Sequence, residues 1–186
     1  MFEPVPHATR KFTAAEVQRM VDSGILREDE KVELIEGDLI AVSPQSSTHV
    51  LLTVIIRDVL ARALGEGYFV QDHSPVQGTA DSLPEPDIAV VRGSPRQLGA
   101  LARAADTVLV LEISVSSRAI DRKKARVYAQ AGYATYWLVD VDARRLEVRT
   151  GPTPDGEYAR TEILGESAEV ALPTLDAKLS VRELLP

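Results

Sequence analysis

The chain has 186 residues, of which 45% are hydrophobic and 26% charged, the composition of an ordinary soluble globular protein. Its formal net charge of −7 argues against binding nucleic acid over a broad surface, because phosphate contacts need local positive charge, but it leaves room for a local basic site. The absence of cysteine excludes disulfides, thiolate metal sites and cysteine nucleophiles, and it fits a reducing cytoplasm.

The sequence indicates a cytoplasmic protein of one domain over residues 1–186. No apolar run approaches the roughly 20 residues that a membrane-spanning helix needs. The N-terminus lacks the charged and apolar regions of a signal peptide. Residues 1–10 hold two prolines and no periodic pattern, so we expect a loose arm there.

The first third of the chain predicts a short helix, a β-hairpin and a long helix, over residues 13–23, 31–42 and 48–64. Thr13 and Glu16 have the spacing of a capping box, which places a helix start at Thr13. Glu36-Gly37-Asp38 separates two short runs that read as strands, a pattern typical of a tight hairpin turn. Thr48 is expected to cap the long apolar helix.

The rest of the chain alternates predicted strands with helices. Strands are expected over residues 68–71, 86–91, 107–114, 135–139, 145–149 and 158–164. A loop with a helical turn is expected over 93–105, a basic helix from near Asp121, and a final helical turn over 180–184. Because strands and helices interleave, we expect an α/β (α+β) fold with a mixed sheet flanked by helices.

Asp87 and Glu112 are carboxylates in strands whose other side chains are mostly apolar. An acidic side chain is rarely buried unless it is paired or binds a metal. If the two strands are neighbours, the facing residues lie within roughly 5 Å at Cβ, so both carboxylates can reach one Mg²⁺ or Mn²⁺. The alternative is that each residue merely marks the polar end of a strand.

The helix after the second of these strands is rich in cations. Lys124 and Tyr128 are one turn apart and share a face. A lysine directed inward would stabilise charge developing on a phosphate, while Arg122 and Lys123 would contact the nucleic-acid backbone. The alternative is a solvated helix surface.

A series of motifs, in this order and spacing, resembles the Uma-two family of bacterial endonucleases. They are Glu33-Leu34-Ile35-Glu36-Gly37, Ser43-Pro44, His49, Pro86-Asp87-Ile88-Ala89-Val90-Val91, Leu111-Glu112-Ile113-Ser114, Tyr128-Ala129-Gln130-Ala131-Gly132 and Tyr136-Trp137-Leu138-Val139-Asp140. The resemblance covers nearly the whole chain after residue 10, and the family is similar to the PD-(D/E)XK nucleases.

The resemblance implies a restriction-endonuclease-like fold and a metal-dependent endonuclease that hydrolyses DNA. Asp87 would be the acid of the PD element and Glu112 the second acid, and together they would hold the metal. The signature places its lysine two residues after the second acid, where this chain has Ser114. The lysine is expected on the following helix instead, at Lys124, with Lys123 as the alternative.

The resemblance also implies roles for two residues outside this signature. Glu33 would be a further acidic residue of the centre, and His49 would line the same cleft. The alternative for His49 is a helix-start histidine bonded to backbone. The chain's histidines, His7, His49 and His73, are scattered in sequence, and no His–Glu spacing indicates zinc.

Many nucleases of this fold cut both strands of DNA as two-fold pairs, so a homodimer is expected, paired through a sheet edge or the hairpin near Gly37. A different reading is a nuclease fold kept as a catalytically inactive binding or assembly module. Ser114 at the usual lysine position and the acidic net charge favour that alternative.

Overall fold

The computed structural model describes residues 9–27, 29–42, 44–115 and 118–186. Its helices are α1 (Ala14–Asp22), α2 (Ser47–Leu64), α3 (Pro95–Leu98), α4 (Arg118–Gln130) and the 3₁₀ helix η1 (Val181–Leu184). Its strands are β1 (Val32–Ile35), β2 (Asp38–Ala41), β3 (Tyr68–Asp72), β4 (Ile88–Arg92), β5 (Thr107–Ser114), β6 (Thr135–Asp140), β7 (Arg145–Pro152), β8 (Tyr158–Gly165), β9 (Glu169–Ala171) and β10 (Lys178–Ser180).

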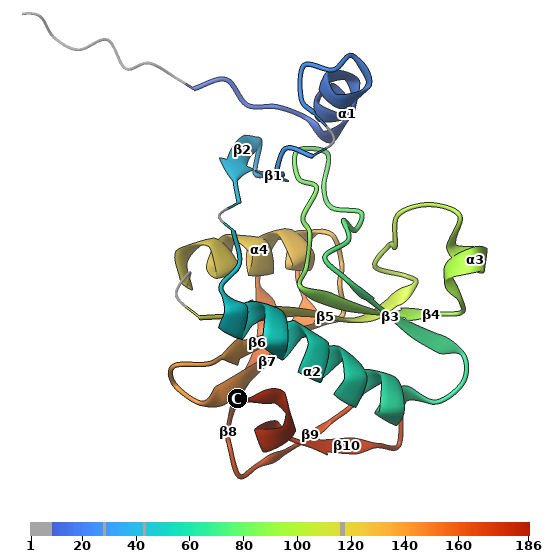
Figure 1. The fold of residues 1–186 in the computed structure, drawn as a ribbon, viewed down its shortest axis with the longest axis vertical. Helices are drawn as coiled ribbons and strands as arrows, with labels where there is room; N and C mark the ends of the chain where they lie inside the picture. The colour runs from blue at the N-terminus through green and yellow to red at the C-terminus, as the bar shows by residue number, and fades with distance from the viewer. Residues whose placement is uncertain (1–8, 28, 43, 116–117) are drawn as a thin grey trace, which may run out of the picture.

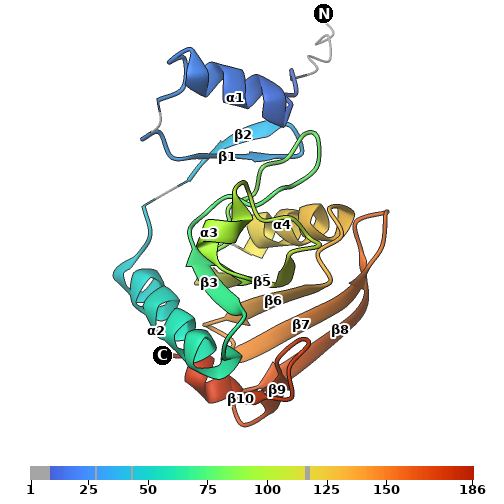
Figure 2. The same cartoon turned by 90° about the vertical axis from the view of Figure 1, so that its right-hand side faces the viewer.

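Six strands form the central sheet in the order β3-β4-β5-β6-β7-β8. Neighbours are antiparallel except β5 and β6, which run parallel because α4 connects them as a crossover. The β1–β2 hairpin lies with α1 at one end of the molecule, next to α4, and the β9–β10 hairpin lies at the other end (Figures 1 and 2). This is the predicted mixed sheet flanked by helices.

Helices cover both faces of the central strands (Figure 2). On one face, Ile88 and Val90 pack with residues of α2 and η1. On the other face, Ala89 and Val91 pack with residues of α4, including Tyr128. All residues of β5 and β6 are buried, which explains their nearly continuous apolar sequences.

Several local predictions are confirmed. The capping box of α1 is present, with the Thr13 and Glu16 side chains each bonded to the other's backbone N–H. Glu36 and Gly37 both have positive φ, 50° and 80°, as a two-residue type I′ hairpin turn requires. The final helical turn forms as η1. None of the helices in the described part of the chain is long and apolar enough to cross a bilayer.

Other boundaries differ from the predictions. Ser46, not Thr48, caps α2, because its side chain accepts the backbone N–H of His49 at 3.2 Å. The basic helix begins at Arg118, about one turn before the expected start near Asp121. The β9–β10 pair was not predicted, since strands of three residues carry too short an alternation to recognise. Of the predicted N-terminal arm, residues 1–8 lie outside the described residues.

Candidate active site

Residues at the ends of β3 and β4 lie side by side with residues of β5. His73 follows β3, and its backbone N–H donates to the carbonyl of Asp87 at 3.2 Å. Asp87 immediately precedes β4, and its Oδ2 accepts the N–H of Ile113 in β5 at 2.7 Å. The strands that carry Asp87 and Glu112 are therefore neighbours, as the metal prediction required. Both residues are buried, at 8% and 3% of the whole residue exposed.

The helix α4 directs Lys124 toward these carboxylates. Its Nζ lies 2.8 Å from Oε1 of Glu112 and 3.3 Å from Oε2 of Glu33, and it donates to the carbonyl of Glu85 at 2.7 Å. Lys124 is 5% exposed, whereas Lys123 faces solvent. Of the two lysines that the sequence left open, Lys124 is therefore the one that points inward.

Glu33 reaches the site from the β1–β2 hairpin. Its Oε2 accepts the backbone N–H of Glu85 at 3.3 Å as well as facing the Lys124 amine. The backbone N–H of Leu83 donates to the carbonyl of Leu34 at 2.8 Å, which ties the same loop to β1. The β1–β2 hairpin, the loop that carries Leu83 and Glu85, and α4 together hold the Lys124 amine in place.

Tyr128 is a member of the cluster that the sequence did not assign to the site. Its hydroxyl donates to Oε1 of Glu112 at 2.7 Å, and the residue is fully buried one turn after Lys124. The i, i+4 spacing of Lys124 and Tyr128 was the signal for this shared face. The Lys124 ammonium meets the same oxygen, so Glu112 is held through Oε1.

The electrostatics of the cluster are those of crowded carboxylates beside one ammonium. Burial raises the pKa of Glu112 well above its usual range; the Lys124 charge opposes this, and the charges of Asp87 and Glu33 add to it. Burial also acts to raise the pKa of Asp87, but the hydrogen bond and charge of His49 and the charge of Lys124 outweigh it, so that pKa is lowered. Burial favours neutral Lys124, yet the carboxylates, led by Glu112, raise its pKa.

The donor set of Asp87 and Glu112 fits a divalent cation. Both supply carboxylate oxygens, the ligands that Mg²⁺ and Mn²⁺ prefer. A cation between them would offset the burial and the neighbouring negative charges that raise the pKa of Glu112. The N–H of Ile113 fixes Oδ2 of Asp87, and the Tyr128 hydroxyl fixes Oε1 of Glu112. In each carboxylate, this orients the second oxygen.

His49 and His73 both face Asp87. His49 stands in the first turn of α2, and its Nε2 lies 3.1 Å from Oδ2 of Asp87. Nδ1 of His73 lies 3.7 Å from Oδ1. The histidines are scattered in sequence, but the fold brings these two together, because strand pairing places His73 beside Asp87. His7 lies outside the described residues.

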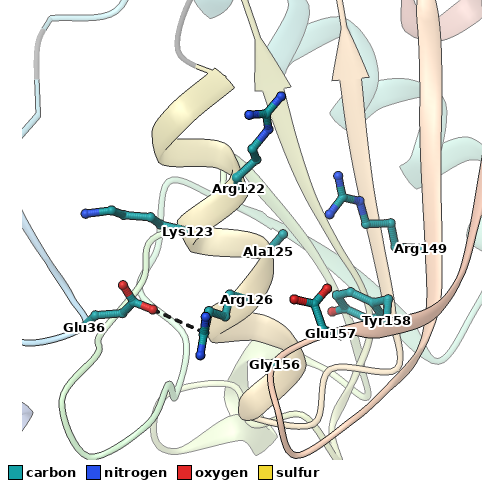
Figure 3. A pocket seen from close by; sticks show the side chains of 9 residues that line it. All are labelled: Glu36, Arg122, Lys123, Ala125, Arg126, Arg149, Gly156, Glu157 and Tyr158. Atoms are coloured by element: carbon teal, nitrogen blue, oxygen red, sulfur yellow. Dashed lines mark ion pairs between the residues drawn. The ribbon is translucent and has the colours of Figure 1, made fainter.

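The exposed face of α4 forms one wall of a basic cavity of about 440 Å³ (Figure 3). The cavity is lined by Glu36, Arg122, Lys123, Ala125, Arg126, Arg149, Gly156, Glu157 and Tyr158. Arg126 is paired with Glu36 at 3.5 Å, while the exposed side chains of Arg122 and Lys123 project from the helix in different directions. Four cations against two carboxylates make this a locally positive hollow on an acidic protein.

Comparisons with known proteins give a family match and a likeness in fold. A family model, Uma2, described as "Putative restriction endonuclease", matches residues 14–182. A solved structure from Anabaena variabilis, described as a "putative nuclease belonging to DUF820", superposes with a TM-score of 0.74 at 21% sequence identity, over 93% of this chain and 97% of that chain. At that identity the likeness shows the fold, which is restriction-endonuclease-like, as expected. No curated protein matches the chain.

Proposed function

The chain belongs to the Uma2 family, and from that premise we propose that it is a nuclease that hydrolyses DNA phosphodiester bonds with the help of a divalent metal ion. One observation carries the proposal. Asp87 immediately precedes β4, Glu112 lies in the neighbouring strand β5, and the Lys124 amine lies 2.8 Å from Glu112. Two buried acids beside an inward ammonium suit a site where a cation and a phosphate meet.

Asp87 and Glu112 would hold the metal through the oxygens that their protein donors leave available. When bound, Mg²⁺ or Mn²⁺ polarises a phosphoryl oxygen and makes the attacking water more acidic. The N–H of Ile113 fixes Asp87, and the Tyr128 hydroxyl fixes Glu112, so neither acid has to be ordered at the moment of reaction. His49 supports Asp87 from α2 in the same way.

Lys124 would supply the positive charge that stabilises the phosphate as it gains negative charge. The raised pKa keeps the amine protonated, since the carboxylates around it outweigh its burial. Glu33 and the carbonyl of Glu85 aim the amine, which places Glu33 in a positioning role. In this proposal Lys124, on α4, takes the role of the signature's lysine, whose usual position in β5 is occupied by Ser114.

Cleavage should therefore depend on added metal. We expect the protein, stripped of metal, to nick or linearise supercoiled DNA only after Mg²⁺ or Mn²⁺ is supplied, and to stop when EDTA is added, because neither acid alone can activate water at neutral pH. The measurement is gel analysis of plasmid with single-stranded RNA in parallel. Equal cleavage in EDTA would contradict the metal dependence, and cleavage of RNA alone would contradict the choice of substrate.

The basic cavity beside α4 would guide the DNA backbone. Replacing Arg122 or Lys123 with glutamine should weaken DNA binding and reduce the slope of log affinity against log salt by about 0.9 each, since each neutralised phosphate releases about that much counterion. Binding is measured in EDTA so that no cleavage occurs. Arg182→Gln, an exposed arginine on η1, is the matched control. Identical slopes for all variants would remove the cavity from the DNA path.

A second candidate function is an inactive nuclease fold that binds or assembles. It is favoured by Ser114 at the usual lysine position, and by the full set of contacts that already occupies the Lys124 amine. This candidate predicts no Mg²⁺ binding by calorimetry. Mg²⁺ binding that disappears in Asp87→Asn would reject it.

We propose in addition that two copies pair along β8. This strand is an edge of the sheet, most of its residues are exposed, and Ile163 is 57% exposed. The hairpin turn is the weaker choice, because Gly37 already bonds Phe12 and Asp81 of its own chain. Light scattering should give twice 20.3 kDa, and Ile163→Lys should return the single-chain mass. A single-chain mass for the wild type would exclude the pair.

A further inference from the structure

Two imidazoles and a carboxylate converge beside the proposed nuclease centre. His49, His73 and Asp87 each offer one ligand atom, and these atoms all lie within 4.8 Å of one another. They come from three separate segments, the start of α2, the residue after β3 and the residue before β4. Folding therefore assembles this group from parts that are distant in sequence.

The separations are close to those of a metal's ligands. Nitrogen and oxygen ligands that sit about 2.1 Å from a tetrahedral ion lie roughly 3.4 Å from each other. Nε2 of His49 is 3.1 Å from Oδ2 of Asp87, and Nδ1 of His73 is 3.7 Å from the other oxygen, Oδ1. The two imidazoles thus face the two oxygens of one carboxylate, and one ligand atom from each residue lies within 4.8 Å of the others.

The backbone holds these side chains in place. His73 pairs with Asp87 through its N–H and adopts a left-handed φ of 42°, which is uncommon for a residue with a side chain. His49 is fixed by the Ser46 cap. The side chains of His49, His73 and Asp87 are 14%, 31% and 12% exposed, so an ion can enter from solvent.

Hydrogen bonding alone accounts for part of this arrangement. The His49–Asp87 contact can be a plain hydrogen bond, but the 3.7 Å between His73 and Asp87 is too long for one. Nδ1 of His73 instead lies 3.1 Å from the side-chain nitrogen of Gln45. The Gln45 amide nitrogen can only donate, so an ion bound through Nδ1 of His73 would take the place of this hydrogen bond.

We propose that His49, His73 and Asp87 form a binding site for a divalent transition metal ion that favours imidazole, of the Zn²⁺ or Ni²⁺ type. Mixed nitrogen and oxygen ligands suit these ions, whereas a pair of carboxylates suits Mg²⁺. The site shares Asp87 with the proposed nuclease centre but does not need Glu112, Lys124 or nuclease activity. An ion held there would draw Asp87 away from the carboxylate pair.

The test is calorimetric titration of Zn²⁺, and separately Ni²⁺, into metal-stripped protein that carries no histidine tag. We expect one ion per chain. His73→Asn and His49→Gln should weaken binding by at least about 100-fold, because even losing an outer partner of a ligand costs roughly 10–100-fold. Asparagine tolerates the left-handed backbone at position 73, and glutamine can keep a hydrogen bond to Asp87.

Two control variants separate this site from its surroundings. Glu112→Gln should keep Zn²⁺ binding while it loses Mg²⁺ binding, and His7→Asn should keep both. Zn²⁺ binding that is absent in the wild type, or unchanged in His73→Asn, would overturn the proposal. If cleavage of DNA fails while Zn²⁺ titrates as expected, the nuclease function falls and the metal site stands.

A measurement on the wild type covers the case in which a variant does not fold. Side-chain ¹⁵N NMR should show the signals of two of the three histidines shifting as Zn²⁺ is added. Assignment of the unshifted signal to His7 would complete the result. A spectrum in which no histidine shifts, or in which His7 alone shifts, would reject the site.

Discussion

Replacing Glu112 with glutamine is expected to lower the rate of DNA cleavage in saturating Mg²⁺ by at least about 100-fold, the size of effect seen when one preorganised electrostatic group is removed. Glutamine keeps the shape of the side chain and can still accept the hydrogen bonds of Tyr128 and Lys124. It loses the negative charge that holds a cation next to Asp87. The measurement is the initial rate of plasmid nicking at several Mg²⁺ concentrations.

The fold should survive this change. Burial raises the pKa of Glu112 above that of an unfolded glutamate. The ionised side chain therefore opposes folding, and this cost grows as pH rises from the unfolded pKa toward the raised one. Glutamine removes the cost at neutral pH. Glutamine also takes a facing charge away from the Lys124 ammonium, which opposes this gain. Because Glu33 and the carbonyl of Glu85 still face the amine, the melting temperature at pH 7 should fall less than in Lys124→Met. Glu66→Gln, in the exposed turn after α2, is the matched control and should leave cleavage unchanged. Full activity in Glu112→Gln would exclude this carboxylate from the metal centre.

Replacing Lys124 with methionine is expected to cost both activity and stability. Methionine fills similar space but leaves the carboxylates of Glu112 and Glu33 facing each other without their ammonium. Removing one partner of a buried ion pair costs about 3–5 kcal/mol. For a chain of this size that lowers the melting temperature by roughly 6–20 °C. Differential scanning calorimetry in EDTA checks this value.

The neighbouring residue provides the control. Lys123→Met makes the same chemical change one position earlier, where the side chain faces solvent, and should shift the melting temperature little. Adding Mg²⁺ should raise the melting temperature of Lys124→Met more than that of the wild type, since the ion then supplies the missing positive charge. Equal melting temperatures for the two lysine variants would show that the buried cluster does not depend on Lys124.

Local chemistry in the sequence was enough to place most helices and strands. The capping box at Thr13 and the turn at Gly37 follow from the bonding and backbone preferences of a few neighbouring residues. The apolar runs around Asp87 and Glu112 predicted buried strands. The two carboxylates stand out there because acidic side chains are rarely buried without a partner. The three-residue strands β9 and β10 escaped notice because a short segment has no clear period.

What the sequence determined by itself is which side chains share a face, because that depends only on the repeat of a helix or a strand. It put Lys124 with Tyr128, and it marked Asp87 and Glu112 as acids that need a partner. Only the tertiary structure decided which residues are the partners of these acids and of Lys124. Contacts between distant segments decide this: the pairing of β3 with β4 brings His73 beside Asp87, and the position of the β1–β2 hairpin next to α4 directs Glu33 to the Lys124 amine.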